Sequence, residues 1–108
     1  PFLVTLQGAT ALGDTYSRLL MAPPSPLEDP FTGSATGAMA AYLWQNGMMD
    51  KDSFIAEQGH AMGRPGQARV ARVGSRDAMQ GVQVAGAGYV LMRGTVDLPA
   101  ALDLPEAL

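Results

Sequence analysis

The chain has 108 residues, of which 47% are hydrophobic and 16% are charged, and its formal net charge is −3. This composition is typical of one small folded domain rather than a disordered chain, and the negative charge argues against nucleic acid as the main partner. The absence of cysteine excludes disulfides and thiolate metal sites. Since the sequence contains neither an apolar stretch of about 18 residues nor a signal-peptide pattern, we expect a cytoplasmic protein without a membrane partner.

The first part of the chain predicts two strands. Residues 1–6 have a strand pattern and begin at Pro1, with no initiator methionine ahead of it. Residues 7–13 contain two glycines and predict a loop, and residues 14–22 predict a second strand. The prolines between residues 23 and 26 then end all regular structure.

A helix is predicted from residue 33 to residue 46, because Gly47 suits the left-handed position that follows a helix. Between residues 35 and 44 only Thr36 is polar, and many of the others are small. A helix at a protein surface shows a polar face at 3.6-residue spacing, and this segment shows none. The segment is also too short to span a membrane. We therefore expect a helix that is buried among strands.

More strands follow the helix. In the last of them the even-numbered residues from Val84 to Leu98 are apolar or glycine, whereas Arg93 and Asp97 lie on the other side. This period of two predicts a half-buried strand. Residues 99–108 have no convincing period and are predicted to be a loose tail. The strands after the helix are expected near residues 53–58, 67–73, 80–86 and 88–98.

Residues 28–37 join an acidic pair and a proline turn to the start of the predicted helix. The first four N–H groups of a helix have no partner within it, and together they carry about half a positive charge. The small residues Gly33, Ser34 and Ala35 allow a ligand to come close to these groups. The segment is therefore a candidate anion site, with Asp29 and Ser34 at its rim to handle protons or hydroxyls.

Four segments resemble the phenazine-biosynthesis PhzF-like family. Residues 28–35, Glu-Asp-Pro-Phe-Thr-Gly-Ser-Ala, are similar to that family's Glu-Asp-Pro-x-Thr-Gly-Ser-Ala. Residues 58–65, Gln-Gly-His-Ala-Met-Gly-Arg-Pro, are similar to its Gln-Gly-x-x-x-Gly-Arg-Pro. Residues 84–94 match a third, weaker pattern, and residues 16–23 resemble the strand that leads into the acidic turn. Because the four segments lie in register, the resemblance covers nearly the whole chain.

The resemblance implies an α+β fold of the diaminopimelate epimerase type. Proteins of this type have two similar domains, each a barrel-like, mostly antiparallel sheet wrapped around one central buried helix, with the active site in the cleft between them. This chain matches the C-terminal domain only, so residues 1–98 are predicted to form part of that domain and residues 99–108 a tail. The expected protein partner is the missing N-terminal domain or a second copy of this chain.

The same resemblance implies an isomerase or epimerase that moves a proton on a small carboxylate-bearing substrate without a cofactor. The family's main acid/base is a glutamate of the N-terminal domain, which has no counterpart here, so whether this chain alone is an enzyme stays open. Asp29 matches the family's assisting aspartate, and Gly33 and Ser34 match the site that binds the substrate carboxylate. The alternative is a stand-alone module that binds a small anion or serves in assembly without catalysis. No spacing of His, Asp and Glu predicts a metal site.

Each candidate residue also has a structural interpretation. Asp29 is placed to cap a turn or helix, and Ser34 to bond the backbone of the first helical turn. Glu28 is expected to be a solvated or structural acid, and Thr32 an N-cap. His60 falls on a variable position of the second motif and is not favoured as a base.

The remaining motif residues are expected to shape turns or pack. Gln58 either lines the cleft or bonds a turn, and the rest of the second motif predicts turn chemistry. Tyr42 and Trp44 are expected to be core or domain-contact residues. Solvated positions rather than a nucleic-acid patch are expected for four arginines, at 64, 69, 72 and 76.

Overall fold

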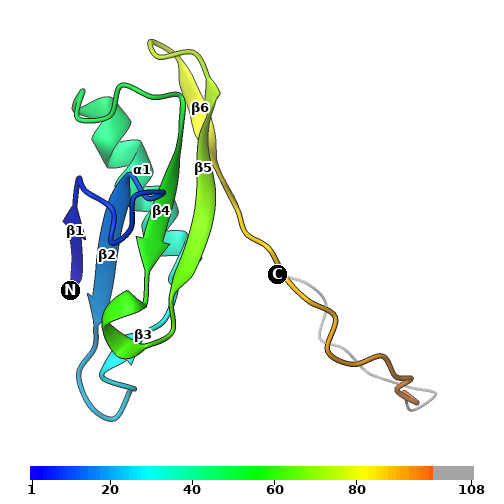
Figure 1. Ribbon diagram of the computed structural model, residues 1–108. Coiled ribbons are helices and arrows are strands. Elements are labelled where there is room, and N and C mark those ends of the chain that lie inside the picture. The colour runs from blue at the N-terminus through cyan, green and yellow to red at the C-terminus, as the bar shows by residue number, and fades with distance from the viewer. Residues whose placement is uncertain (99–108) are drawn as a thin grey trace.

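One sheet and one α-helix make up the body of the molecule (Figure 1). The computed structural model describes residues 1–98. The predicted tail, residues 99–108, lies outside the described residues. The elements in chain order are β1 (Phe2–Thr5), β2 (Thr15–Leu20), β3 (Glu28–Asp29), α1 (Gly33–Gln45), β4 (Ser53–Gln58), a short 3-10 helix (His60–Met62), β5 (Gly66–Gly74) and β6 (Met79–Ala85).

The strands lie in the order β1-β2-β4-β5-β6, with β3 paired to β2 beside this row. All pairs are antiparallel except β2 and β4, which run parallel. A parallel pair needs a long crossover, and here β3 and α1 supply it. The predicted α+β class and mostly antiparallel sheet are confirmed. The sheet is nevertheless open, because no described strand joins β1 to β6, so residues 1–98 do not close the predicted barrel.

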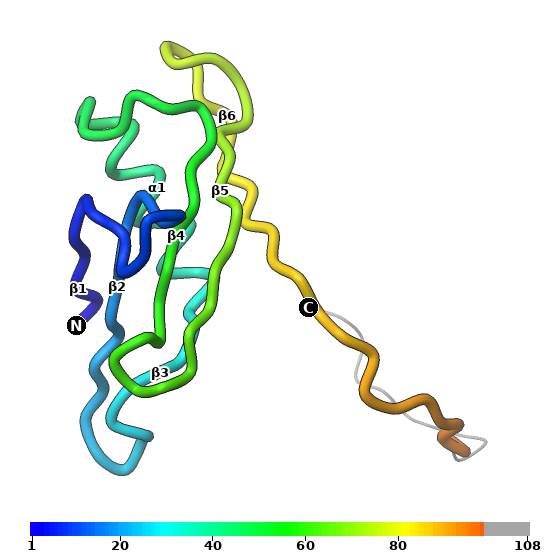
Figure 2. Tube along the Cα trace, viewed as in Figure 1, coloured from blue at the N-terminus to red at the C-terminus, as the bar shows by residue number. Residues whose placement is uncertain are grey.

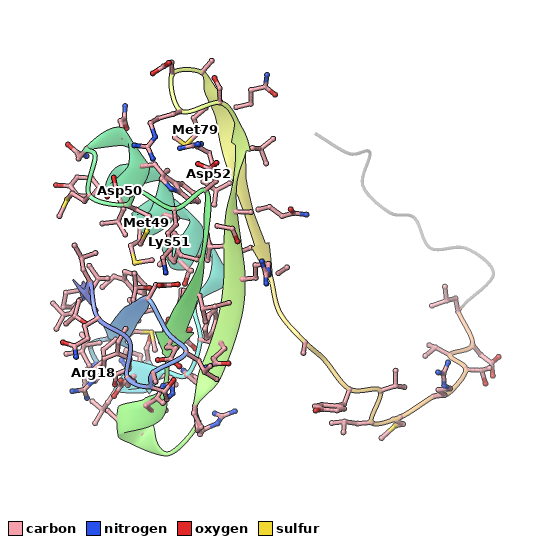
Figure 3. The ribbon with its side chains drawn as sticks, turned by 45° about the horizontal axis from the view of Figure 1, so that its top comes forward. Arg18, Met49, Asp50, Lys51, Asp52 and Met79 are labelled. Atoms are coloured by element: carbon pink, nitrogen blue, oxygen red, sulfur yellow. The ribbon has the colours of Figure 1, made fainter. Side chains whose placement is uncertain are left out.

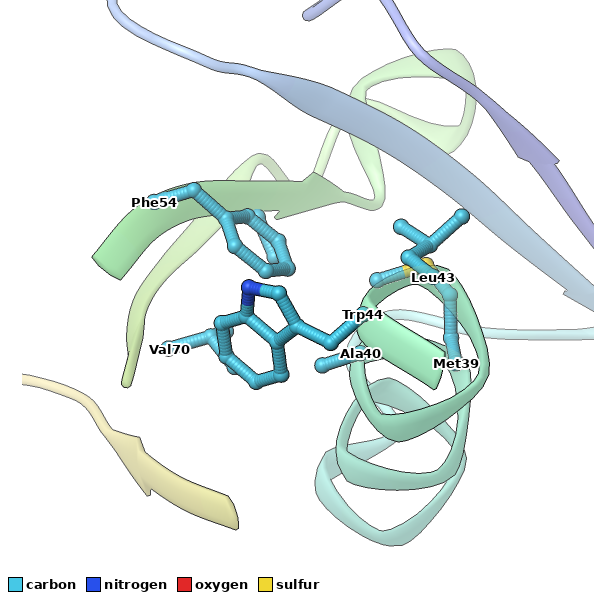
Figure 4. Packing of buried hydrophobic residues seen from close by; sticks show 7 residues of the cluster. Met39, Ala40, Leu43, Trp44, Phe54 and Val70 are labelled. Carbon is cyan, nitrogen blue, oxygen red and sulfur yellow. The ribbon is translucent and has the colours of Figure 1, made fainter. Parts of the chain in front are cut away.

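The core lies between α1 and one face of the sheet (Figure 4). Phe54 and Ala56 alternate along β4 and so point to the same face, where the ring of Trp44 meets that of Phe54 edge-on at 5.5 Å between centroids. The indole N–H of Trp44 donates to the carbonyl of Lys51 at 2.7 Å, which confirms Trp44 as a core residue. The buried cluster consists of Met39, Ala40, Leu43, Trp44, Phe54, Ala56 and Val70.

The helix is not buried on all sides, and that prediction is wrong for the described residues. Ser34, Ala38 and Gln45 are exposed, and the side chain of Tyr42 is 60% exposed, so Tyr42 is no core residue. The cause is architectural, since one open sheet covers only one side of a helix. Small side chains on every face of α1 hide which side this is, because alanine and glycine suit both exposed and buried positions.

Residues 86–98 form no strand, although a strand over 88–98 was expected. The chain leaves β6 and runs away from the body (Figure 2). Its apolar side chains are in water, with Tyr89 91% exposed and Leu91 95% exposed. A strand is held by hydrogen bonds to a neighbouring strand, and none of residues 1–85 supplies one here. The alternating pattern thus indicates an apolar face on residues 86–98, but it does not identify the segment that packs against this face.

The ends of the helix agree with the prediction. Thr32 is the N-cap, and Gly47 has a φ of 65°, the left-handed conformation that suits glycine after a helix. β3 and the 3-10 helix were not predicted, since segments of two or three residues carry no periodic signal. Among the helices described, none has the length and apolarity needed to cross a membrane.

Candidate active site

The acidic turn begins as a strand. Glu28 and Asp29 form β3, in which Asp29 pairs with Leu19 of β2. The guanidinium of Arg18 donates two hydrogen bonds of 2.9 Å to the carboxylate of Glu28. These bonds lower the pKa of Glu28 below its ordinary value. Glu28 is therefore a structural acid that fixes the turn to β2, as the sequence predicted.

Asp29 faces the start of the helix. The hydroxyl of Thr32 donates to Oδ2 of Asp29 at 2.5 Å. Thr32 holds the N-cap position, but its side chain makes no capping bond to the helix. Its backbone carbonyl instead accepts the N–H of Thr36, at 2.9 Å. The predicted N-cap is confirmed as a position, while its hydroxyl serves Asp29.

The first turn of α1 is open to solvent. Gly33 and Ser34 are exposed, and a side chain at Gly33 would meet no atom within 4 Å. Within residues 1–98, the N–H groups of Gly33, Ser34 and Ala35 have no backbone acceptor, and the Ser34 hydroxyl has no hydrogen-bond partner. The three predicted site residues, Asp29, Gly33 and Ser34, therefore lie beside one accessible helix start. This arrangement suits an anion at the N–H groups next to a carboxylate that handles protons.

The second motif, residues 58–65, packs against this turn. Gln58, at the end of β4, is 1% exposed, and its side-chain amide bonds the backbone carbonyl of Asp29 and the backbone N–H of Thr32. Gly59 has a φ of 88°, and a side chain there would overlap the carbonyl oxygens of Pro30 and Arg64. Of the two interpretations of Gln58, the structure shows the turn-bonding one.

His60 is part of a different cluster. Its Nε2 lies 3.8 Å from Oε1 of Glu57, and its ring packs edge-on against Tyr16. Glu57 is fully buried and was not singled out from the sequence. It accepts the N–H and the hydroxyl of Thr10, at 2.9 and 2.6 Å, and the amide of Gln67, at 2.6 Å. Burial raises the pKa of Glu57, but these hydrogen bonds outweigh burial and lower it.

A sequence signal for Glu57 does exist. Glu57 is the one acid within residues 53–58. It occupies an odd-numbered position of β4, whereas Phe54 and Ala56 occupy even-numbered ones. Because successive side chains of a strand point to opposite faces, Glu57 lies on the sheet face away from the helix, which is expected to be solvated. The loop from β1 to β2 covers it instead, and no local pattern shows that a loop folds back there.

Two of the four arginines lie beside acids. Arg72 is packed against the indole of Trp44, with its guanidinium carbon 5.9 Å from the ring centroid, and it pairs with Asp52. Arg76 lies near Asp50. Figure 3 shows Asp50 and Asp52 at the end of the body away from Arg18. Arg72 was expected to be solvated, and that prediction is wrong, because its side chain is only 6% exposed. In the described part of the chain, no three His, Asp or Glu side chains are grouped as a metal site requires.

Comparison with known proteins identifies the family of the chain. The model of the family described as phenazine biosynthesis-like protein matches residues 4–94. The chain belongs to that family, as the resemblance implied. It is 38% identical over 58 residues to an uncharacterized isomerase, YfhB, of Bacillus subtilis, a match that covers 53% of this chain and 20% of the relative. It is also 38% identical over 71 residues to an uncharacterized isomerase of Deinococcus radiodurans, covering 62% of this chain and 23% of that protein. The chain thus spans about a fifth of the length of these relatives.

Proposed function

We propose that this chain is part of a PhzF-like isomerase that moves a proton on a small carboxylate-bearing substrate without a cofactor. The observation that carries the proposal is the position of Asp29 beside the open start of α1. Family membership and the two relatives called isomerases support it. The role of this chain is to supply the carboxylate-binding helix start, at Gly33 and Ser34, and an assisting acid/base, Asp29.

The chemistry follows from the charges at the site. A substrate carboxylate bound by the N–H groups of Gly33 and Ser34 lies at the positive end of the helix. When a base removes a proton from the neighbouring carbon, the electron pair left behind spreads into the carboxylate, and the same N–H groups stabilise it. Asp29 helps to pass the proton, which returns to carbon at another position or face. The base that starts the reaction belongs to the part of the protein that this chain does not include.

The surfaces left open by this chain fit such a partner. The exposed side of α1 and the apolar residues of 86–98 are faces that a folded protein covers. The chain spans about a fifth of its relatives' length. We propose that the rest of a two-domain protein, or a second copy of this chain, covers these faces and closes the sheet.

The test uses a longer protein that carries this segment. Solvent-proton exchange in heavy water is followed by NMR over a panel of small carboxylic acids with a C–H bond next to the carboxylate, amino acids included. Asp29→Asn keeps the shape of the side chain but removes its titratable proton, so turnover should fall by about 10²- to 10⁴-fold with KM little changed. Ser34→Ala should instead weaken binding, by about 1–3 kcal/mol for a charge-assisted hydrogen bond.

Two exposed residues serve as matched controls. Asp77→Asn and Ser25→Ala make the same chemical changes away from the helix start, and both should leave turnover and KM as they are. The 108-residue chain by itself should catalyse no exchange. Full turnover in the Asp29→Asn protein, or exchange by the isolated chain, would contradict the proposal. Binding of the acids without exchange in the longer protein would favour the anion-binding module.

A further inference from the structure

The side chain of Gln58 joins the two motifs through three hydrogen bonds. Its Nε2 donates to the backbone carbonyl of Asp29 at 2.9 Å and to the hydroxyl oxygen of Thr32 at 3.1 Å. Its Oε1 accepts the backbone N–H of Thr32 at 3.1 Å. The orientation of the amide is unambiguous, because a backbone N–H only donates and a carbonyl only accepts. Both N–H groups of the amide are therefore used on this one turn.

These bonds fix the direction of the Thr32 hydroxyl. A hydroxyl has a single proton, and the oxygen of Thr32 already accepts from Gln58. The proton must therefore point at the remaining neighbour, Oδ2 of Asp29, 2.5 Å away. A carboxylate oxygen accepts such a bond readily. The result is a directed chain of donors that runs from Gln58 through Thr32 to Asp29.

The hydroxyl of Thr32 does not cap the helix. A threonine at an N-cap ordinarily accepts an N–H of the first helical turn, which stabilises the helix. Thr32 makes no such bond. A capping hydroxyl would occupy the N–H of Ser34 or Ala35. The Thr32 side chain leaves both N–H groups free while it holds Asp29.

The backbone of the turn fits closely against the second motif and against Gly66, the residue that follows it. A side chain at Gly59 would come within 2.6 Å of the Pro30 carbonyl oxygen, and one at Gly66 within 2.9 Å of the Phe31 ring. Such distances are shorter than van der Waals contact. Because no side chain intervenes, Gln58 reaches both Asp29 and Thr32 from the end of β4.

We propose that Gln58 and Thr32 are positioning residues for Asp29. Gln58 orients the hydroxyl of Thr32, and this hydroxyl holds the Asp29 carboxylate in one rotamer by donating to Oδ2. Oδ1, which accepts no hydrogen bond from residues 1–98, is left for the substrate. The same amide fixes the N-cap, so one buried residue sets the place of the proton-handling carboxylate relative to the anion-binding helix start. This inference rests on the proposed function.

The first experiment is independent of catalysis and uses the 108-residue chain. NMR three-bond couplings between Hα and the two Hβ protons of Asp29 report its χ1 rotamer. The parent and Thr32→Ser, which keeps the hydroxyl, should show one fixed rotamer. Thr32→Val, which keeps the shape and removes the hydroxyl, should show averaged couplings, and Thr32→Ala serves as a second variant if the valine protein does not fold. Thr5→Val, at an exposed threonine, is the matched control and should leave Asp29 unchanged.

The second experiment uses the longer protein and the exchange assay. Thr32→Val should lower kcat by up to about 100-fold with KM unchanged, the effect of a misplaced catalytic group, and Thr32→Ser should restore it. In the Asp29→Asn background the valine substitution should have no further effect. A fixed Asp29 rotamer in both Thr32→Val and Thr32→Ala would overturn the positioning role. If instead the couplings average but Asp29→Asn leaves turnover intact, the positioning role stands and the proposed function fails.

Discussion

The acidic turn at residues 28–34 and the segment at residues 86–98 differ in how many contacts they make with the rest of the chain. Both lie in motifs that resemble one family. The turn is fixed by Arg18 on one side and by Gln58 beneath, so its polar groups have partners from two other strands. Residues 86–98 leave the sheet with their apolar side chains in water. The shape of a motif thus depends on the segments packed against it. Within residues 1–98, other strands pack against the acidic turn but not against residues 86–98.

The largest expected effect comes from filling the space between the two motifs. Gly59→Ala should lower the free energy of unfolding by about 3 kcal/mol. An L-residue pays about 1–2 kcal/mol in the left-handed region, and overlap with two carbonyl groups adds to this. Urea unfolding followed by circular dichroism measures the change. Gly88→Ala is the matched control in the unsupported segment, where nothing lies within 4 Å, and should be nearly neutral. If the two variants were equally stable, the backbone at Gly59 would be no more tightly packed than the backbone at Gly88.

A smaller effect should follow from the buried acid beside the second motif. Glu57→Gln places an NH₂ group against the donors of Thr10, so at neutral pH it should lower the free energy of unfolding by about 2 kcal/mol. The pKa of Glu57 is lowered in the folded protein, so its stabilisation is present above the unfolded pKa of about 4.3 and is lost as the pH falls through the folded value.

The pH dependence is the sharper part of this prediction. Urea unfolding of the parent and Glu57→Gln between pH 7 and pH 3 should show a difference that narrows below about pH 4.3. A constant difference over this range would mean that the carboxylate does not titrate with folding. Asp14, whose pKa is lowered chiefly by its bond from Lys51, also adds acid sensitivity, and Glu57→Gln leaves that contribution in place.

The smallest effect on stability is expected in residues 86–98. The double variant Val90→Ser, Met92→Ser should change the free energy of unfolding by less than about 0.5 kcal/mol, because both side chains are already in water. It should, however, reduce self-association of the chain in sedimentation velocity at rising concentration, since it removes exposed apolar surface. Val84→Ser, at a half-buried residue packed on the core, is the comparison and should cost about 1–2 kcal/mol. If the double variant is as unstable as Val84→Ser, residues 86–98 are packed within the chain.

The sequence by itself determined the family, the helix and most of the strands. The helix ends were readable because Thr32 and Gly47 are residue types with a physical preference for those positions. The candidate site was readable because Asp29, Gly33 and Ser34 lie within six residues of one another. Local order of this kind depends on neighbours in the chain, which a sequence shows directly.

Only the tertiary structure decided which partners these residues have. Asp29 and Gln58 are 29 residues apart, and the link between them depends on β2 and β4 lying parallel and adjacent in the sheet. The burial of Glu57 depends on a loop folded over the far face of the sheet, and the open side of α1 depends on a sheet that does not close. These are long-range contacts, whose geometry depends on how whole elements pack and not on the spacing of residues along the chain.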